Sequence, residues 1–159
     1  MSKPVRAVYD CMILVQAAAR PARTHATFQL ARNHQVELCI SPAILEEVSD
    51  VLTRPEVQAK FSELKPPVAA AFLEELRGIA IMVGDVPEVF HLPRDPKDEP
   101  YVNLAIAVQP CSLVTWNQRH LTYLMDRNTP EGIGFCQRFP GVVIADPPAF
   151  VQHLKDRVR

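Results

Sequence analysis

Residues 36–52 read Val-Glu-Leu-Cys-Ile-Ser-Pro-Ala-Ile-Leu-Glu-Glu-Val-Ser-Asp-Val-Leu, and this stretch contains the repeating unit of the fold. Its first five residues are mostly apolar and predict a short buried strand. Ser41 is a favourable N-cap and Pro42 suits the first helical position, so a helix is predicted from Pro42 to about Thr53. The stretch therefore encodes a strand followed at once by a helix.

The same unit recurs along the rest of the chain. Further strands are predicted at residues 5–9, 81–83, 112–115 and 142–145. Further helices are predicted at residues 11–19, 24–33, 66–79, 99–108 and 148–155, with a loop at 126–134. Short Val- and Ile-rich strands that alternate with helices indicate a mostly parallel sheet covered on both faces. The predicted fold class is α/β, a single three-layer α/β/α domain with about five strands.

Length and composition agree with one globular domain spanning residues 1–159. The chain has 48% apolar residues, enough for a full core, and a formal net charge of −1. This balance excludes a strongly basic nucleic-acid-binding domain, so any contact with nucleic acid must come from a local patch. Neither a membrane-spanning run nor a signal peptide is visible, and a cytoplasmic location without membrane association is predicted.

The four cysteines are expected to be reduced thiols packed among apolar neighbours. Cys11, Cys39, Cys111 and Cys136 form no CxxC pair and have no histidine at zinc-finger spacing. Small buried thiols are the usual outcome for such isolated cysteines in a reducing compartment.

Acidic residues stand at the edges of three separate predicted elements. Asp10 ends the first strand, Glu47 lies at the margin of the apolar stripe of the helix at 42–53, and Asp98 precedes the helix at 99–108. In doubly wound sheets, ligands bind at the carboxyl ends of the strands. Because carboxylates repel one another, their convergence at this edge predicts a site for a hard metal ion.

Each acidic residue also has a purely structural interpretation. Asp10 and Asp98 could cap the helices that follow them. Glu47 could border the core with its carboxylate in water, while Glu46 points away from the apolar stripe. Asn117, just after the fourth strand, could be a turn residue, a helix cap, or an oxygen donor to a metal or its water. The sequence leaves these alternatives open.

The order of these segments resembles the PIN domain, a metal-dependent nuclease fold. The resemblance extends from residues 7–10 to 146–151. It rests mainly on the segments 41–48, 95–100, 104–107 and 113–117. Their order and spacing are most similar to the bacterial branch of toxins from toxin–antitoxin pairs, the VapC-like ribonucleases.

The resemblance implies hydrolysis of RNA phosphodiester bonds with Mg²⁺ or Mn²⁺. It places Asp10, Glu47, Asp98 and Asn117 at the catalytic positions, with the three acids as metal ligands. Asp95 is a further candidate ligand that could offset a missing charge. The family also suggests a cognate antitoxin protein and a homodimer as partners.

Four further residues are candidates for contact with the substrate. Thr115 could hydrogen-bond a ligand or a phosphate, and Arg94, Lys97 and Arg119 flank the acidic segments. These cations could supply a local positive rim for a polyanion. Ordinary solvated charge is the alternative for each of them.

Two positions depart from the family pattern. Met12 stands where many members have Asn, and Asn117 stands where many have Asp. The first change removes a polar group that could orient Asp10, and the second removes one negative charge from the site. The alternative function is therefore a catalytically weak or inactive PIN-like module that binds RNA or protein. A phosphoacceptor domain and a small-molecule phosphatase are more distant alternatives.

Overall fold

A computed structural model describes residues 3–20, 25–117, 119 and 121–158, and the structural statements below refer to these residues. Five parallel strands form one sheet in the order β3-β2-β1-β4-β5. The strands are β1 (Val5–Tyr9), β2 (Val36–Ile40), β3 (Ile81–Met82), β4 (Cys111–Val114) and β5 (Val142–Ala145). The predicted α/β fold class is confirmed, and every strand pair is parallel.

Helices connect the strands and cover the sheet. They are α1 (Cys11–Ala19), α2 (Ala26–Arg32), α3 (Pro42–Leu52), α4 (Pro55–Lys60), α5 (Pro66–Ile79), α6 (Glu99–Ala107), α7 (Pro130–Arg138) and α8 (Pro147–Val158). Two 3₁₀ turns, η1 (Pro96–Asp98) and η2 (Thr122–Met125), precede α6 and α7. Within the described ranges, no helix combines the length and the apolar character needed to cross a membrane.

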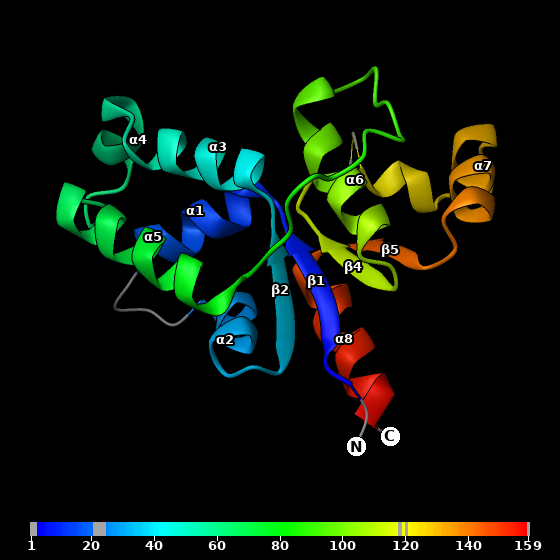
Figure 1. Ribbon diagram of the computed structural model, residues 1–159, viewed down its shortest axis with the longest axis horizontal. Coiled ribbons are helices and arrows are strands. Elements are labelled where there is room, and N and C mark those ends of the chain that lie inside the picture. The colour runs from blue at the N-terminus through cyan, green and yellow to red at the C-terminus, as the bar shows by residue number, and fades with distance from the viewer. Residues whose placement is uncertain (1–2, 21–24, 118, 120, 159) are drawn as a thin grey trace.

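The strand order determines which helices share a face of the sheet. Right-handed crossovers from β1 to β2 and from β2 to β3 place α1 to α5 on one face. After β3 the order reverses, so the crossovers through α6 and α7 lie on the other face. Figure 1 shows α1, α3, α4 and α5 grouped on one side of the view and α6 and α7 on the other. The reversal makes the carboxyl ends of β1 and β4 the switch point, where ligands bind in such sheets.

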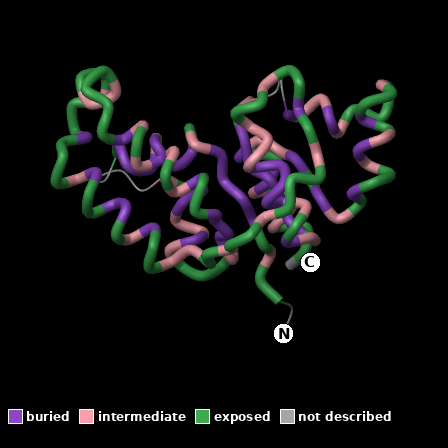
Figure 2. The backbone as a smooth tube through the Cα atoms, turned by 45° about the horizontal axis from the view of Figure 1, so that its top comes forward, coloured by how far each residue is buried: buried purple, intermediate pink, exposed green. Residues whose placement is uncertain are grey.

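Tyr9, at the end of β1, contacts both α2 and α8, so these two helices pack on the same face of the sheet. Its hydroxyl donates to the backbone oxygen of Thr27, at 2.8 Å. Its ring meets that of Phe150 edge-on, with centroids 6.2 Å apart. Figure 2 shows the buried residues concentrated in the central strands and on the inward sides of the helices around them. The core therefore runs along both faces of the sheet.

Most predicted elements are confirmed, because their signals are local. Ser41 caps α3 by accepting a hydrogen bond from the Ile44 backbone nitrogen, at 3.3 Å. Strand β4 begins one residue earlier than predicted, and α8 extends three residues further. The predicted start of the second helix at Thr24 lies outside the described residues. The prediction lacked α4: Pro55 ends α3 but also occupies the first turn of a new helix, where its missing N–H costs nothing.

The predicted loop at 126–134 is wrong from residue 130 onward, because α7 begins there. Thr129 caps this helix and accepts from the Gly132 nitrogen, at 3.0 Å. A Cβ atom at Gly132 would lie 1.8 Å from the backbone oxygen of Asp126. Glycine is therefore required here for close packing, and its presence concealed the helix from the sequence pattern.

The expectation for the cysteines is confirmed. All four are free thiols. Cys39 and Cys111 are buried, and Cys11 and Cys136 are half-buried.

The two glycines of α7 give a matched pair of stability predictions. Gly132→Ala should lower the free energy of unfolding by about 1–3 kcal/mol, because the new methyl group collides with backbone. Gly134 has open space around it. Gly134→Ala should instead raise the free energy of unfolding by about 0.5–1 kcal/mol, because alanine favours the helix. Urea unfolding of both variants tests this, and equal effects would contradict the close approach at Gly132.

Candidate metal centre

Asp10 is the buried carboxylate at the carboxyl end of β1. It is 7% exposed. One oxygen, Oδ1, accepts from the Ile13 backbone nitrogen at 3.0 Å and so caps α1. The other, Oδ2, accepts a hydrogen bond from the Thr115 hydroxyl, which follows β4. The capping alternative is therefore confirmed for one oxygen, while the second is directed toward the neighbouring strand.

Thr115 and Asn117 extend this contact into a chain of hydrogen bonds. The Thr115 hydroxyl oxygen also accepts from the Asn117 backbone nitrogen, at 2.9 Å. The Asn117 side-chain nitrogen donates to Oδ2 of Asp98, at 2.8 Å. Asp10, Thr115, Asn117 and Asp98 are thus joined across β1, β4 and the start of α6. This series of hydrogen bonds brings together Asp10 and Asp98, two of the three acids that the sequence predicted for the site.

Asp98 lies at the N-cap position of α6, but its side chain makes no capping hydrogen bond. The pKa of Asp98 is raised to about 6. Burial is the main cause, and the nearby carboxylates of Asp95 and Asp10 contribute to the rise. The hydrogen bond from Asn117 opposes these effects. The capping function belongs to Asp95, which accepts from the Lys97 nitrogen at the start of η1. Asp98 is thus a half-buried carboxyl group among like charges.

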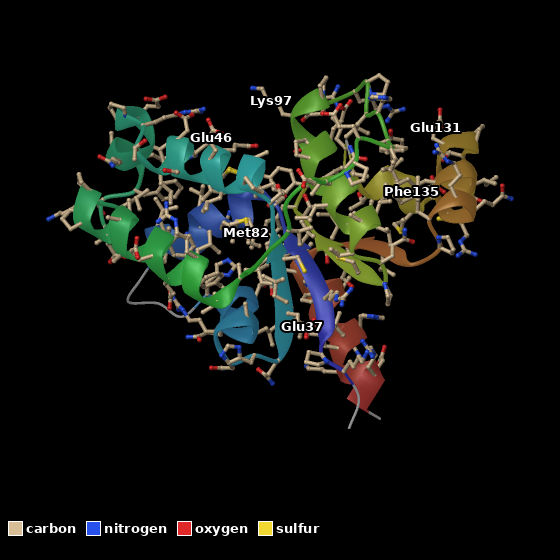
Figure 3. The ribbon with its side chains drawn as sticks, viewed as in Figure 1. Glu37, Glu46, Met82, Lys97, Glu131 and Phe135 are labelled. Carbon is tan, nitrogen blue, oxygen red and sulfur yellow. The ribbon has the colours of Figure 1, made fainter. Side chains whose placement is uncertain are left out.

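Glu47 approaches the same region from α3. It is half-buried, whereas Glu46 is exposed, as the helical stripe predicted. Figure 3 shows the Glu46 side chain at the outer rim of α3. Burial and then the Glu47 charge raise the pKa of the Cys11 thiol to about 12. The thiol is therefore protonated at neutral pH, which argues against a nucleophilic Cys11.

Tyr101 is a site residue that the sequence analysis placed only in the apolar stripe of α6. Burial is the main cause that raises its pKa, and the neighbouring Cys11, Glu47 and Asp10 side chains raise it further. Its hydroxyl is buried without a hydrogen-bond partner among the described residues. The sequence did contain a signal for the involvement of Tyr101 in the site, because it lies three residues after Asp98 on the same side of the helix.

This donor set fits a hard divalent cation. Asp10, Glu47, Asp98 and Asp95 offer carboxylate oxygens, which Mg²⁺ and Mn²⁺ prefer. Burial, and then the carboxylates of Asp95 and Asp10, raise the pKa of Asp98, and a bound cation would favour its ionised form. Within the described parts of the chain, no three His, Cys, Asp or Glu side chains stand close enough to hold an ion as they are placed. Binding would therefore require the carboxylates to turn toward one another.

The candidate substrate residues surround this edge at different depths. Thr115 is fully buried and contacts Asp10 and Asn117. Arg94 is exposed and stacks over the Tyr123 ring, 4.2 Å from its centroid. The two other cations, Lys97 and Arg119, are exposed, and Figure 3 shows Lys97 at the outer rim just before α6.

Two other exposed side chains are notable at this edge. Met12 is 45% exposed, and Trp116 is 47% exposed directly after the buried Thr115. Met12 stands where the family resemblance expects Asn, and its thioether offers no strong hydrogen-bonding group to the carboxylates.

An acidic switch point in a doubly wound parallel sheet defines a class of domains that bind a ligand or metal at the strand ends. Within that class, the PIN domain family matches residues 6–119, which is more than half of the chain. The chain belongs to the PIN domain family, whose members are generally metal-dependent nucleases. A search of curated proteins found no match to the chain.

The raised pKa of Asp98 predicts a defined pH dependence of stability. A carboxyl group with a raised pKa in the fold favours the folded state at low pH, and this contribution is lost as pH rises through about 6. In chelator, Asp98→Asn should therefore match wild type near pH 4 and show a higher Tm near pH 7.5. Thermal unfolding at both pH values measures this, with Glu46→Gln as an exposed control for lost charge. An equal Tm difference at both pH values would contradict the crowding of Asp98.

The buried hydroxyl of Thr115 should contribute measurably to stability. Thr115→Val keeps the shape but removes the hydroxyl that bonds Oδ2 of Asp10 and the Asn117 backbone nitrogen. We expect it to lower the free energy of unfolding by about 1–3 kcal/mol in urea. Thr115→Ser keeps the hydroxyl and should lose only about 1 kcal/mol for the missing methyl group. A smaller loss for valine than for serine would exclude the hydrogen-bond chain.

Proposed function

We propose that this protein is a Mg²⁺- or Mn²⁺-dependent endoribonuclease that hydrolyses RNA phosphodiester bonds. Asp10, Glu47 and Asp98 hold the ion, and Asp95 is an additional ligand. The observation that carries the proposal is the hydrogen-bond chain that joins Asp10 to Asp98 at the switch point. Burial and the neighbouring carboxylates raise the pKa of Asp98 there. Membership in the PIN domain family supports it independently.

The chemistry divides between the ion and the protein. When bound, a divalent ion polarises a phosphate oxygen and lowers the pKa of a bound water. Asp10 has little freedom to move, because both of its oxygens accept hydrogen bonds from the fold. Asn117 orients Asp98 by donating to its Oδ2 oxygen. The protein thus holds Asp10 and Asp98 in place, and the carboxylates of the proposed set would still have to turn toward the ion.

The biological role that best fits this activity is the toxin of a toxin–antitoxin pair. The order of the segments 41–48, 95–100 and 113–117 supports this more specific proposal. It includes a cytoplasmic location, a homodimer and a small antitoxin protein that blocks the acidic edge. Growth arrest on induction of the wild type, but not of Asp98→Asn, would be the corresponding cellular result.

A second function has its own support. Asn117 occupies a position where many family members have Asp, and its amide is bonded to Asp98. The described carboxylates also do not form a closed ligand set as they stand. Both observations favour a PIN-like module that binds RNA or protein with weak catalysis or none.

Neighbouring glutamates on α3 provide the sharpest test of the nuclease. Glu47→Gln removes a proposed ligand and should reduce cleavage of single-stranded RNA roughly 100-fold or more in Mn²⁺ and in Mg²⁺. Glu46→Gln removes the same charge from the exposed neighbour and should retain activity within about twofold. Cleavage should stop in chelator. The measurement is the initial rate on a labelled RNA, with folding of each variant checked by thermal unfolding.

One result would overturn the nuclease proposal, and a second would correct its ligand set. The first is a folded wild-type protein that cleaves no RNA with either metal, which would favour the binding module. The second is equal activity of the two glutamine variants, which would remove Glu47 from the site.

A further inference from the structure

We propose that single-stranded RNA binds along a groove beside α8, which leads from the acidic edge to a basic cluster at the opposite end of the sheet. We call this surface the α8 track, and its residues are Thr27, Trp116, Val151, Lys155, Lys3 and Arg157. The proposal rests on the nuclease function and adds the path that the substrate follows outside the metal centre.

Trp116 marks the beginning of the α8 track at the acidic edge. Its side chain is 47% exposed, although it follows the fully buried Thr115. It lines a hollow of about 410 Å³ together with Thr27 of α2 and Pro147 at the start of α8. An exposed indole beside a concave surface is suited to stacking on a nucleic-acid base.

Shared lining residues place the three hollows next to one another along the proposed groove. Val151 and Lys155 line the first hollow and also a second one of about 480 Å³. Lys3 and Arg157 line the second hollow and also a third one of about 830 Å³. Figure 1 shows α8 running beside β1, with both ends of the chain at the same end of the molecule. The twelve residues of α8 give this groove a length of roughly 18 Å.

Positive charge gathers at the far end of the α8 track. Lys3, Lys155 and Arg157 are exposed, and all three line the second hollow. Arg6 adds a fourth cation and lies 3.5 Å from Glu37. Glu37 is the one carboxylate among the described residues that line the three hollows. Because the chain carries a formal net charge of −1, this cluster is a local excess.

The combination of charge and shape favours a single nucleic-acid strand. The cations can contact phosphates, and the binding free energy then depends on counterion release. Apolar side chains in the second hollow, including Val5, Leu30 and Leu154, can contact unpaired bases. The bases of a duplex are stacked inside the helix, and a flat lipid surface cannot enter the hollows. Single-stranded bases are free to reach both the walls and the Trp116 ring.

Binding measured without catalysis tests the α8 track. The probe is a labelled, unstructured RNA of about 20 nucleotides, followed by fluorescence anisotropy in chelator over a series of salt concentrations. Lys155→Glu with Arg157→Glu should raise the Kd at least about tenfold and reduce the slope of log K against log salt by about 1.4, for two lost phosphate contacts. Trp116→Ala should raise the Kd roughly tenfold without changing that slope.

A matched control separates the α8 track from general electrostatics. Lys60→Glu with Lys65→Glu makes the same change in net charge on α4 and at the start of α5, where both side chains are exposed. This pair should leave the Kd within about twofold, because distant exposed charges are screened. Circular dichroism and thermal unfolding confirm that all variants are folded.

The outcomes distinguish the α8 track from the nuclease function. Cleavage by the wild type with unchanged RNA binding by the track variants would overturn the track and leave the nuclease proposal standing. Binding that depends on the track, without cleavage in Mn²⁺, would support the track and overturn the nuclease. The α8 track would be overturned if the control pair raised the Kd as much as the track variants do. It would also be overturned if duplex RNA or anionic vesicles bound more tightly than the single strand, or if no RNA bound at all.

Discussion

The hydrogen bond from the Thr115 hydroxyl to Asp10 is the contact on which the acidic edge depends. A carboxylate as buried as Asp10 is costly unless its oxygens have partners. The α1 backbone provides one partner and Thr115 provides the other. Because Thr115 also accepts from Asn117, the same hydroxyl fixes the turn after β4 and, through Asn117, the orientation of Asp98. One buried side chain thus couples two strands to the start of α6.

The acidic edge combines firm positioning with unrelieved charge. Asp10 is held on both oxygens, whereas Asp98 is half-buried near Asp95 and Asp10 and has a pKa of about 6. Burial and like charge destabilise the ionised form of Asp98, and a divalent cation would reverse that effect. The fold tolerates this arrangement because the sheet itself fixes the strand ends. A cation bound at this edge would therefore stabilise the fold, which is the property that the proposed nuclease requires.

The carboxylates of the proposed metal site and the cations of the α8 track lie at opposite ends of the strands. Carboxylates gather at the carboxyl ends of β1 and β4, and the cations Lys3, Lys155 and Arg157 gather at the opposite end, along α8. A polyanion is repelled by the first region and attracted by the second. A groove that joins the two, with Trp116 at its acidic end, would hold an RNA strand by its distant phosphates while one phosphate lies near the metal. The net charge of −1 conceals this separation.

The sequence by itself determined the elements and the candidate acids, because their signals are local. Ser41 with Pro42 predicted α3, and the stripe of that helix separated Glu47 from Glu46. Helix α7 was missed because Gly132 is explained only by its close approach to the backbone oxygen of Asp126. Which groups meet was decided by the tertiary structure: Thr115 and Asp10 are 105 residues apart, and the strand order alone makes them neighbours. The burial of the Tyr101 hydroxyl and the course of the α8 track were likewise beyond the sequence, since both depend on packing between elements that no local pattern encodes.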